Sequence, residues 1–470
     1  MLVAVLLIAG VILISYLYYV RIKKETSCSI PGVEATDPKT GNLGDIAKAG
    51  SLHQFLQALH RQYGDIASFW FNQELVVSTV NPPAFRAQSK LFNRPCSLFA
   101  NLLELVGPTS VQYRNDEDGQ FVRRSLDPFF AHEAMAQKMP IFNEVARITA
   151  AKWSQAARNG EQLNLQDEML LMALESIVRI IFGDFYLKHQ SSSQFFQDYT
   201  VCMDEADWRL SHPPSDPNTE QGRKYKEAYE RISVFVTKIY DERQKHEDEL
   251  RERFLIDEIV DISKSAQEVY SLALTYLIGG FHTTGYTMVW MFYYLMQNPE
   301  VEEKLVQEIR KVLDKDDLWA DAIPQLKYMR QVLDETMRCS CLAPYAARYS
   351  NDDITICGHN ISSKTSILQS LGCTIQNPEV WPDPEKFDPE RFSESNLAQK
   401  DALNYPFFGF AGKRKCPGYR FFYFEASSFV AKLVGQFHVK AVDPNLKVGK
   451  VYGLVTKPDT DIWITVEQRQ

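Results

Sequence analysis

The stretch from Val269 to Gln297 constrains the fold more than any other feature of the sequence, because it contains no Asp, Glu, Lys or Arg. A helix of about 20 apolar residues can cross a bilayer, so this stretch must be buried in a membrane or in the core of a large domain. Its centre holds Gly279, Gly280 and His282, which would be costly against lipid and useful against a ligand. We therefore predict a buried core helix, with a second membrane span as the alternative.

The amino terminus is a second apolar stretch. Leu2 to Val20 carries no charge and is followed directly by Arg21, Lys23 and Lys24. Its helical length matches the ~30 Å core of a bilayer, and the bases follow the apolar residues instead of preceding them as in a cleaved signal peptide. The positive-inside rule places the rest of the chain in the cytosol. We predict a transmembrane signal anchor over residues 1–20, a linker over residues 21–44 and one domain over residues 45–470.

Charge and cysteine spacing argue against two classes of protein. The chain has 51 basic and 60 acidic side chains, so no overall positive field is available to hold nucleic acid. Its 8 cysteines include no CxxC pair and no cluster with histidine at zinc spacing. Their irregular spacing favours mostly buried free thiols in a reducing compartment.

Helical spacing dominates the rest of the chain. Residues 51–60 have the period of a helix, and helical patterns prevail from Glu133 to about Asp316. Residues 68–71 and 75–80 flank an Asn-Gln turn as the strands of a short hairpin would. The predicted fold class is therefore mainly α with a small β portion (α+β), in a single globular domain.

Cys416 stands on a basic, glycine-bent loop that opens a helix. The loop runs from Gly412 to Gly418 and contains three bases before the cysteine. A helix amino terminus and nearby bases stabilise a thiolate, which is the form that ligates haem iron. The glycines allow the loop to approach a flat macrocycle closely. On spacing alone, a buried structural cysteine is the alternative.

This loop resembles that of the cytochromes P-450, the haem-thiolate monooxygenases, whose cysteine loop reads FxxGxRxCxG. Four residues match that pattern at the family's offsets: Gly412, Arg414, Cys416 and Gly418. Gly409 takes the place of the family's phenylalanine, which packs over the cysteine, and Phe408 and Phe410 stand on either side of it. The resemblance implies a cytochrome P-450 fold in which Gly412, Arg414 and Gly418 help to bind the cofactor.

Two further motifs occur in the family's order. Glu335 and Arg338 have the i, i+3 spacing of an intrahelical ion pair, and Arg391 follows in Pro-Glu-Arg-Phe. The resemblance implies that these three residues form a buried cluster on the haem side of the core.

The resemblance also implies arginines for the haem carboxylates. Arg348 lies ten residues after Arg338, as in the family, and Arg123 matches a second position. The family often has a tryptophan four residues before the latter arginine, but Gly119 stands there, so Arg124 remains an alternative. Arginine suits such carboxylates because its planar group can bind two oxygens at once. A surface arginine is the plain alternative for either residue.

The oxygen-activating pattern of the family falls on Gly279 to Thr284. The resemblance gives Thr283 the role of hydrogen-bonding the bound oxygen or a water molecule. His282 occupies the position of the family's usual acid. It could relay protons if burial does not keep it neutral, and the alternative is a core or ligand-contacting side chain.

Five segments are similar to the twentieth family of the superfamily, a group without an assigned reaction: Gly41–Leu43, Gly50–His53, Phe69–Phe71, Leu454–Thr456 and Trp463–Val466. For the chain as a whole, the resemblance implies that haem b, bound through Cys416, inserts one oxygen atom from O2 into a lipophilic small molecule. A haem-thiolate isomerase or dehydratase acting on peroxides is one alternative, and a non-catalytic haem or lipid sensor is another.

The implied electron supply is NADPH through a membrane reductase, with cytochrome b5 as a second candidate partner. Lys413, Lys415 and Arg420 beside the cysteine are candidate reductase contacts, or solvated charges. With the predicted anchor, the resemblance implies an enzyme of the endoplasmic reticulum membrane whose catalytic domain lies in the cytosol.

Overall fold

The computed structural model describes residues 30–183, 192–209, 214–245, 253–313, 317–410 and 412–470. The predicted membrane anchor and the first part of the predicted linker lie outside these ranges. Among the described residues, we find no helix whose length and hydropathy would suit a membrane span.

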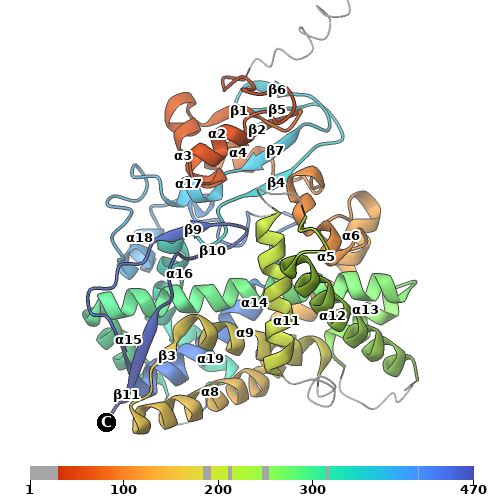
Figure 1. Ribbon diagram of the computed structural model, residues 1–470. Helices are drawn as coiled ribbons and strands as arrows, with labels where there is room; N and C mark the ends of the chain where they lie inside the picture. The colour runs from red at the N-terminus through yellow and green to blue at the C-terminus, as the bar shows by residue number, and fades with distance from the viewer. Residues whose placement is uncertain (1–29, 184–191, 210–213, 246–252, 314–316, 411) are drawn as a thin grey trace, which may run out of the picture.

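Long helices build the body of the molecule (Figure 1). In chain order they are α8 (Met139–Asn159), α9 (Leu165–Phe182), α11 (Ser192–Trp208), α12 (Glu220–Lys245), α14 (Ala266–Gln297), α15 (Pro299–Val312), α16 (Lys327–Ser340) and α19 (Tyr419–Gln436), and the short helix α13 (Leu255–Ile262) lies between α12 and α14 in the chain.

Shorter helices connect them. Before α8 these are α2 (Leu43–Lys48), α3 (Leu52–Tyr63), α4 (Pro82–Ala87), η1 (Ser97–Leu102), α5 (Leu103–Val106), α6 (Asp116–Leu126), η2 (Asp127–Phe130) and α7 (His132–Gln137). After α15 they are η3 (Ala320–Gln325), α17 (Leu371–Ile375), η4 (Pro389–Phe392), α18 (Glu394–Leu397) and η5 (Ala402–Asn404).

Helix α14 crosses the middle of the molecule between other helices (Figure 1). It begins where the Ser265 side chain accepts a hydrogen bond from the Glu268 N–H, and it ends just before Pro299, the first residue of α15. Gly280 lets α14 approach α9 closely, because a Cβ atom there would come within 2.7 Å of Ile177. Most side chains of α14 are buried in the core, which confirms the predicted core helix.

The largest sheet has the strand order β1-β2-β7-β4. Its strands are β1 (Ile66–Phe71), β2 (Glu74–Thr79), β7 (Ser366–Gln369) and β4 (Ala346–Arg348). The pair β1 and β2 is the predicted antiparallel hairpin, and Asn72 adopts the positive φ of 54° that its tight turn requires. The described part of the predicted linker lies along this sheet, where Gly32 forms a bridge with Ser68 and Gly41 with Phe71.

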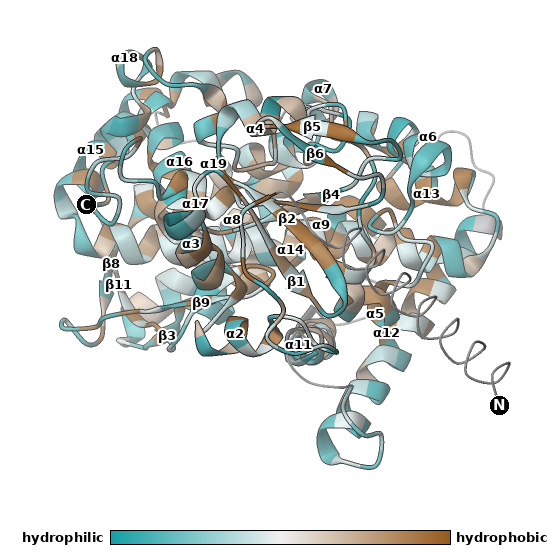
Figure 2. Cartoon of the chain, turned by 90° about the horizontal axis from the view of Figure 1, so that it is seen from above, coloured by the Kyte–Doolittle hydropathy of each residue, from teal (hydrophilic) through white to brown (hydrophobic). Residues whose placement is uncertain are grey.

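Smaller sheets complete the β portion. They contain β3 (Leu163–Asn164), β8 (Phe437–Ala441) and β11 (Trp463–Gln468); β9 (Lys450–Tyr452) and β10 (Thr456–Pro458); and β5 (Ile354–Ile356) and β6 (His359–Ile361). In the view of Figure 2, hydrophilic residues predominate on α6, α15 and α18 at the edge of the molecule, whereas β1 and much of α13 are hydrophobic. The predicted class, mainly helical with a small β portion, is confirmed.

Candidate active site

Cys416 lies two residues before Gly418, the N-cap of α19. Its backbone N–H donates to the Phe408 carbonyl oxygen at 2.9 Å, which closes the loop. Gly412 has a φ of 144°, and a Cβ atom there would come within 2.4 Å of the Ser89 carbonyl oxygen, so the loop requires glycine at this position.

Burial, a backbone hydrogen bond and nearby charges act on the Cys416 thiol. Burial raises its pKa, whereas a hydrogen bond from the Gly418 N–H and the charges of Arg123 and Arg94 lower it. The side chain nevertheless keeps accessible surface. Cys416 is therefore accessible to a ligand, although charged groups stand close to it.

Four arginines gather around this loop. Burial, together with the charge of Arg123, lowers the pKa of Arg94 to about 10. Burial and the other guanidinium groups also lower the pKa of Arg348, and that of Arg414 to about 8. Within the described residues, the one ion pair of this group joins Arg123 Nε to Asp127 Oδ1 at 2.7 Å. The arrangement leaves buried positive charge in excess, which an anionic ligand would stabilise.

The structure separates the two adjacent arginine candidates. Arg123 is buried and its guanidinium donates to the Lys415 carbonyl oxygen at 2.7 Å, directly behind the cysteine. Arg124 points outward and is exposed. Arg414 is tied differently, because it donates to the carbonyl oxygens of Phe92 and Val111 and so fixes the loop to the segment before α6.

Arg94 was missed by the sequence reasoning. It stands in an Asn-Arg-Pro segment before η1 and matches none of the motif offsets. Its closeness to Arg123 and Cys416 arises only when this segment folds against the cysteine loop.

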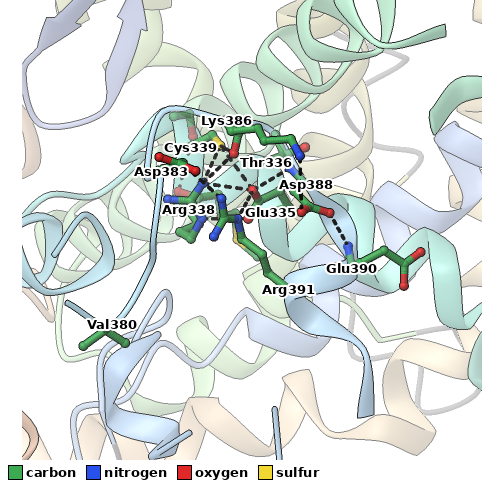
Figure 3. A network of polar contacts seen from close by, with 12 residues as sticks. Glu335, Thr336, Arg338, Cys339, Val380, Asp383, Lys386, Asp388, Glu390 and Arg391 are labelled. Carbon is green, nitrogen blue, oxygen red and sulfur yellow. Dashed lines mark hydrogen bonds and ion pairs between the residues drawn. The ribbon is translucent and has the colours of Figure 1, made fainter. Parts of the chain in front are cut away.

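Glu335, Arg338 and Arg391 come together, as Figure 3 shows. Arg338 Nε donates to Glu335 Oε2 at 2.7 Å, and Arg391 Nε lies 3.4 Å from Glu335 Oε1. The Asp388 N–H also donates to Glu335 Oε1, at 2.8 Å. Glu335 and Arg338 are fully buried, so this cluster joins α16 rigidly to the chain that leads into η4.

The predicted oxygen-activating residues lie on a face of α14 that borders accessible space. Gly279 and Thr283 are one turn apart, both keep accessible surface, and no atom lies within 4 Å of a Cβ placed on Gly279. The Thr283 hydroxyl donates to the Gly279 carbonyl oxygen at 2.6 Å. Its oxygen therefore remains available as an acceptor on this open face.

His282 points into an aromatic cluster. Its ring centroid lies 4.2 Å from that of Phe281, 5.6 Å from that of Tyr199 on α11 and 6.0 Å from that of Tyr286. Burial, with a smaller effect of the Lys457 charge, lowers its pKa to about 3. The imidazole is therefore neutral at pH 7, which favours the packing role over the proton relay.

Comparison with known proteins shows which family this chain is similar to. The model of the family described as Cytochrome P450 matches residues 31–464. Cytochrome P450 20A1 of Rattus norvegicus is 30% identical over 458 residues, 97% of each chain. The Homo sapiens protein of the same name is 26% identical over 460 residues, again 97% of each chain. The Ultra-long-chain fatty acid omega-hydroxylase of Homo sapiens is 27% identical over 376 residues, 73% of this chain and 70% of that protein.

Proposed function

The chain belongs to the cytochrome P450 family of haem-thiolate monooxygenases, and from this premise we propose that Cys416 binds the iron of haem b and that one oxygen atom from O2 is inserted into a lipophilic small molecule. The observation that carries the proposal is the interior, accessible Cys416 thiol among four arginines. Thiolate-ligated haem, when bound, supplies the activation of O2.

The charges around Cys416 fit this cofactor. Arg94, Arg123, Arg348 and Arg414 together with Asp127 leave three positive charges in excess. A cysteine thiolate and the two propionates of haem supply three negative charges, while the ferrous iron and the porphyrin ring are neutral together. Arg94, Arg123 and Arg348 would hold the propionates. Arg414 would act mainly by fixing the loop, because its Nε and both terminal nitrogens already donate to carbonyl oxygens.

Thr283 would order a water molecule or the oxygen on the open face of α14. Its hydroxyl hydrogen is directed to the Gly279 carbonyl, so its oxygen accepts a hydrogen bond from a group that carries a proton toward the site. His282 would instead pack against the aromatic rings beside α14, since its lowered pKa leaves little imidazolium to donate a proton at pH 7.

The face around the cysteine loop suits an acidic electron donor. Lys415 and Arg420 lie over the Tyr419 ring, with Lys415 Nζ 4.1 Å and Arg420 Cζ 4.6 Å from its centroid. With Lys413 they would bind an NADPH-dependent reductase, and cytochrome b5 is a second candidate. The apolar amino terminus would anchor the enzyme in the endoplasmic reticulum membrane. Removal of residues 1–24 should then release the protein from membranes without loss of haem.

Monooxygenation is tested by turnover with isotopically labelled O2. The purified chain is combined with reductase, NADPH and a library of sterols, fatty acids and retinoids, and products are analysed by mass spectrometry. The proposal predicts a product carrying one labelled oxygen atom, formed only with NADPH. Conversion of hydroperoxides alone, without NADPH, would support an isomerase or dehydratase instead, and binding without conversion would support a sensor.

A further inference from the structure

The family's phenylalanine before the cysteine is displaced in this chain, and the structure shows what replaces it. Gly409 has a φ of 74° and no atom within 4 Å of a Cβ placed there, so nothing packs at the usual position. Phe408 takes over instead. Its carbonyl oxygen accepts the Cys416 N–H, and its ring centroid lies 5.5 Å from that of Tyr423, in an edge arrangement.

Tyr423 is itself fixed by two side chains of α16. Its hydroxyl donates to Asp334 Oδ1 at 2.5 Å, and Arg330 Nε donates to Asp334 Oδ2 at 2.9 Å. The Arg330 guanidinium carbon also lies 3.5 Å from the centroid of the Tyr423 ring. Tyr423 and Asp334 are buried, and burial raises the pKa of Tyr423 well above its usual value, so its hydroxyl remains a donor.

Arg330 connects this buried pair to the surface. Its side chain is 56% exposed, although its guanidinium covers the Tyr423 ring. The Phe408 ring centroid also lies 6.2 Å from that of Tyr419, the ring that Lys415 and Arg420 cover, so these contacts adjoin the basic face beside the cysteine loop. The Arg330 charge contributes, after burial and Arg420, to a lowered pKa of Lys415. A continuous series of contacts therefore runs from that face through Arg330, Tyr423 and Phe408 to the Cys416 backbone.

We propose that Arg330, acting through Tyr423 and Asp334, is a positioning residue that holds Phe408 behind Cys416 and transmits the binding of an acidic electron donor to the cysteine loop. This inference rests on the proposed role of Cys416. It assigns to Phe408 the packing that the family gives to the residue at position 409, and it makes the planar shape of the guanidinium, not only its charge, important.

Two variants separate positioning from charge. Arg330→Lys keeps the positive charge but loses the planar group over Tyr423, and Tyr423→Phe keeps the ring but loses the hydrogen bond to Asp334. Lys327→Ala is the matched control, because Lys327 lies one turn earlier on α16 and pairs with Glu394, away from α19. Two measurements are made on the haem-loaded protein: the fraction of the reduced carbon monoxide complex with the thiolate-type band, and the hydrogen exchange rate of the Cys416 amide.

The proposal predicts that Arg330→Lys and Tyr423→Phe each speed exchange of the Cys416 amide by about fivefold, as expected for roughly 1 kcal/mol of lost hydrogen bonding. Both variants should also lower the fraction of the reduced carbon monoxide complex that has the thiolate-type band. The double variant should behave like Tyr423→Phe alone. An unchanged exchange rate in either single variant, or an equal effect of Lys327→Ala, would overturn it.

Failure of the proposed function gives a different result. In that case wild-type protein itself lacks the thiolate-type band, whereas the exchange rates still report whether Tyr423 and Arg330 hold the loop.

A further measurement with reductase tests whether binding of the electron donor is transmitted to the cysteine loop through Arg330. Reductase should slow exchange of the Cys416 amide in wild type and not in Arg330→Lys. The same change in both proteins would reject this part of the proposal.

Discussion

The cysteine side of the site is held by buried charges, whereas its α14 side is held by neutral aromatic rings and hydroxyl groups. Glu335 and Arg338 are fully buried and paired, and buried arginines surround the cysteine loop. On α14, His282 is neutral within stacked rings and Thr283 donates to the helix backbone. A buried charge tolerates little change because losing its partner is costly, whereas neutral packing tolerates changes of shape. The variation from the family pattern at His282 lies on the tolerant side.

The largest expected effect is loss of Glu335. Glu335→Ala leaves Arg338 and Arg391 buried without their carboxylate, so the free energy of unfolding should fall by about 3–5 kcal/mol. Urea denaturation measures it, and Glu394→Ala, which removes an exposed partner of Lys327, should leave the free energy of unfolding nearly unchanged. Equal effects of the two substitutions would remove the contrast between buried and exposed charges.

Arg348 should matter for haem and not for the fold. Arg348→Leu should speed haem release by roughly tenfold to a hundredfold, from roughly 1.5–3 kcal/mol of lost charge-assisted hydrogen bonding. Because burial lowers its pKa, the charge destabilises the haem-free protein, and the substitution should not lower the free energy of unfolding of that form. Arg124→Leu, at an exposed position, should leave haem release unchanged. Equal haem release from the two variants would argue against the arginine cluster as a propionate site.

The burial of His282 should make the free energy of unfolding depend on pH. Its folded pKa of about 3 is below the value in the unfolded chain, so the unfolded state binds the proton first and stability falls as pH drops below the ordinary histidine pKa. At pH 4.5 the resulting decrease in the free energy of unfolding is about 2–3 kcal/mol. His282→Leu should lose correspondingly less stability than wild type on acidification. Product formed per NADPH should show no His282-dependent transition between about pH 6 and 8.

Thr283 should give the smallest effect on structure and a moderate one on catalysis. Thr283→Ala removes the hydroxyl on the open face of α14, so product per NADPH should fall roughly tenfold while hydrogen peroxide rises. Thr283→Ser keeps the hydroxyl and serves as the control. Unchanged coupling in Thr283→Ala, with both proteins fully loaded with haem, would place proton delivery elsewhere.

Spacing along the chain predicted those parts of the site that depend on local pattern. The core helix and the hairpin follow from periodicity, whereas the cluster of Glu335, Arg338 and Arg391 followed from the family resemblance. The choice of Arg123 over Arg124 was also within reach, because Val122, Arg123 and Leu126 share one buried face of α6.

Other features depend on contacts between distant segments. Arg94 reaches the cysteine loop only through tertiary folding, and the low pKa of His282 requires packing against Tyr199 from another helix. The replacement of the family's phenylalanine by Phe408 likewise depends on Tyr423 and α16.

The most direct test of the account is the spectrum of the reduced protein with carbon monoxide. Wild type and Cys357→Ser, which changes an exposed cysteine on the β5–β6 turn, should both show the long-wavelength band of thiolate-ligated haem. Cys416→Ser should lack that band while it keeps the folded structure, as measured by circular dichroism. A thiolate-type band that persists in Cys416→Ser would contradict the assignment of Cys416 as the haem ligand.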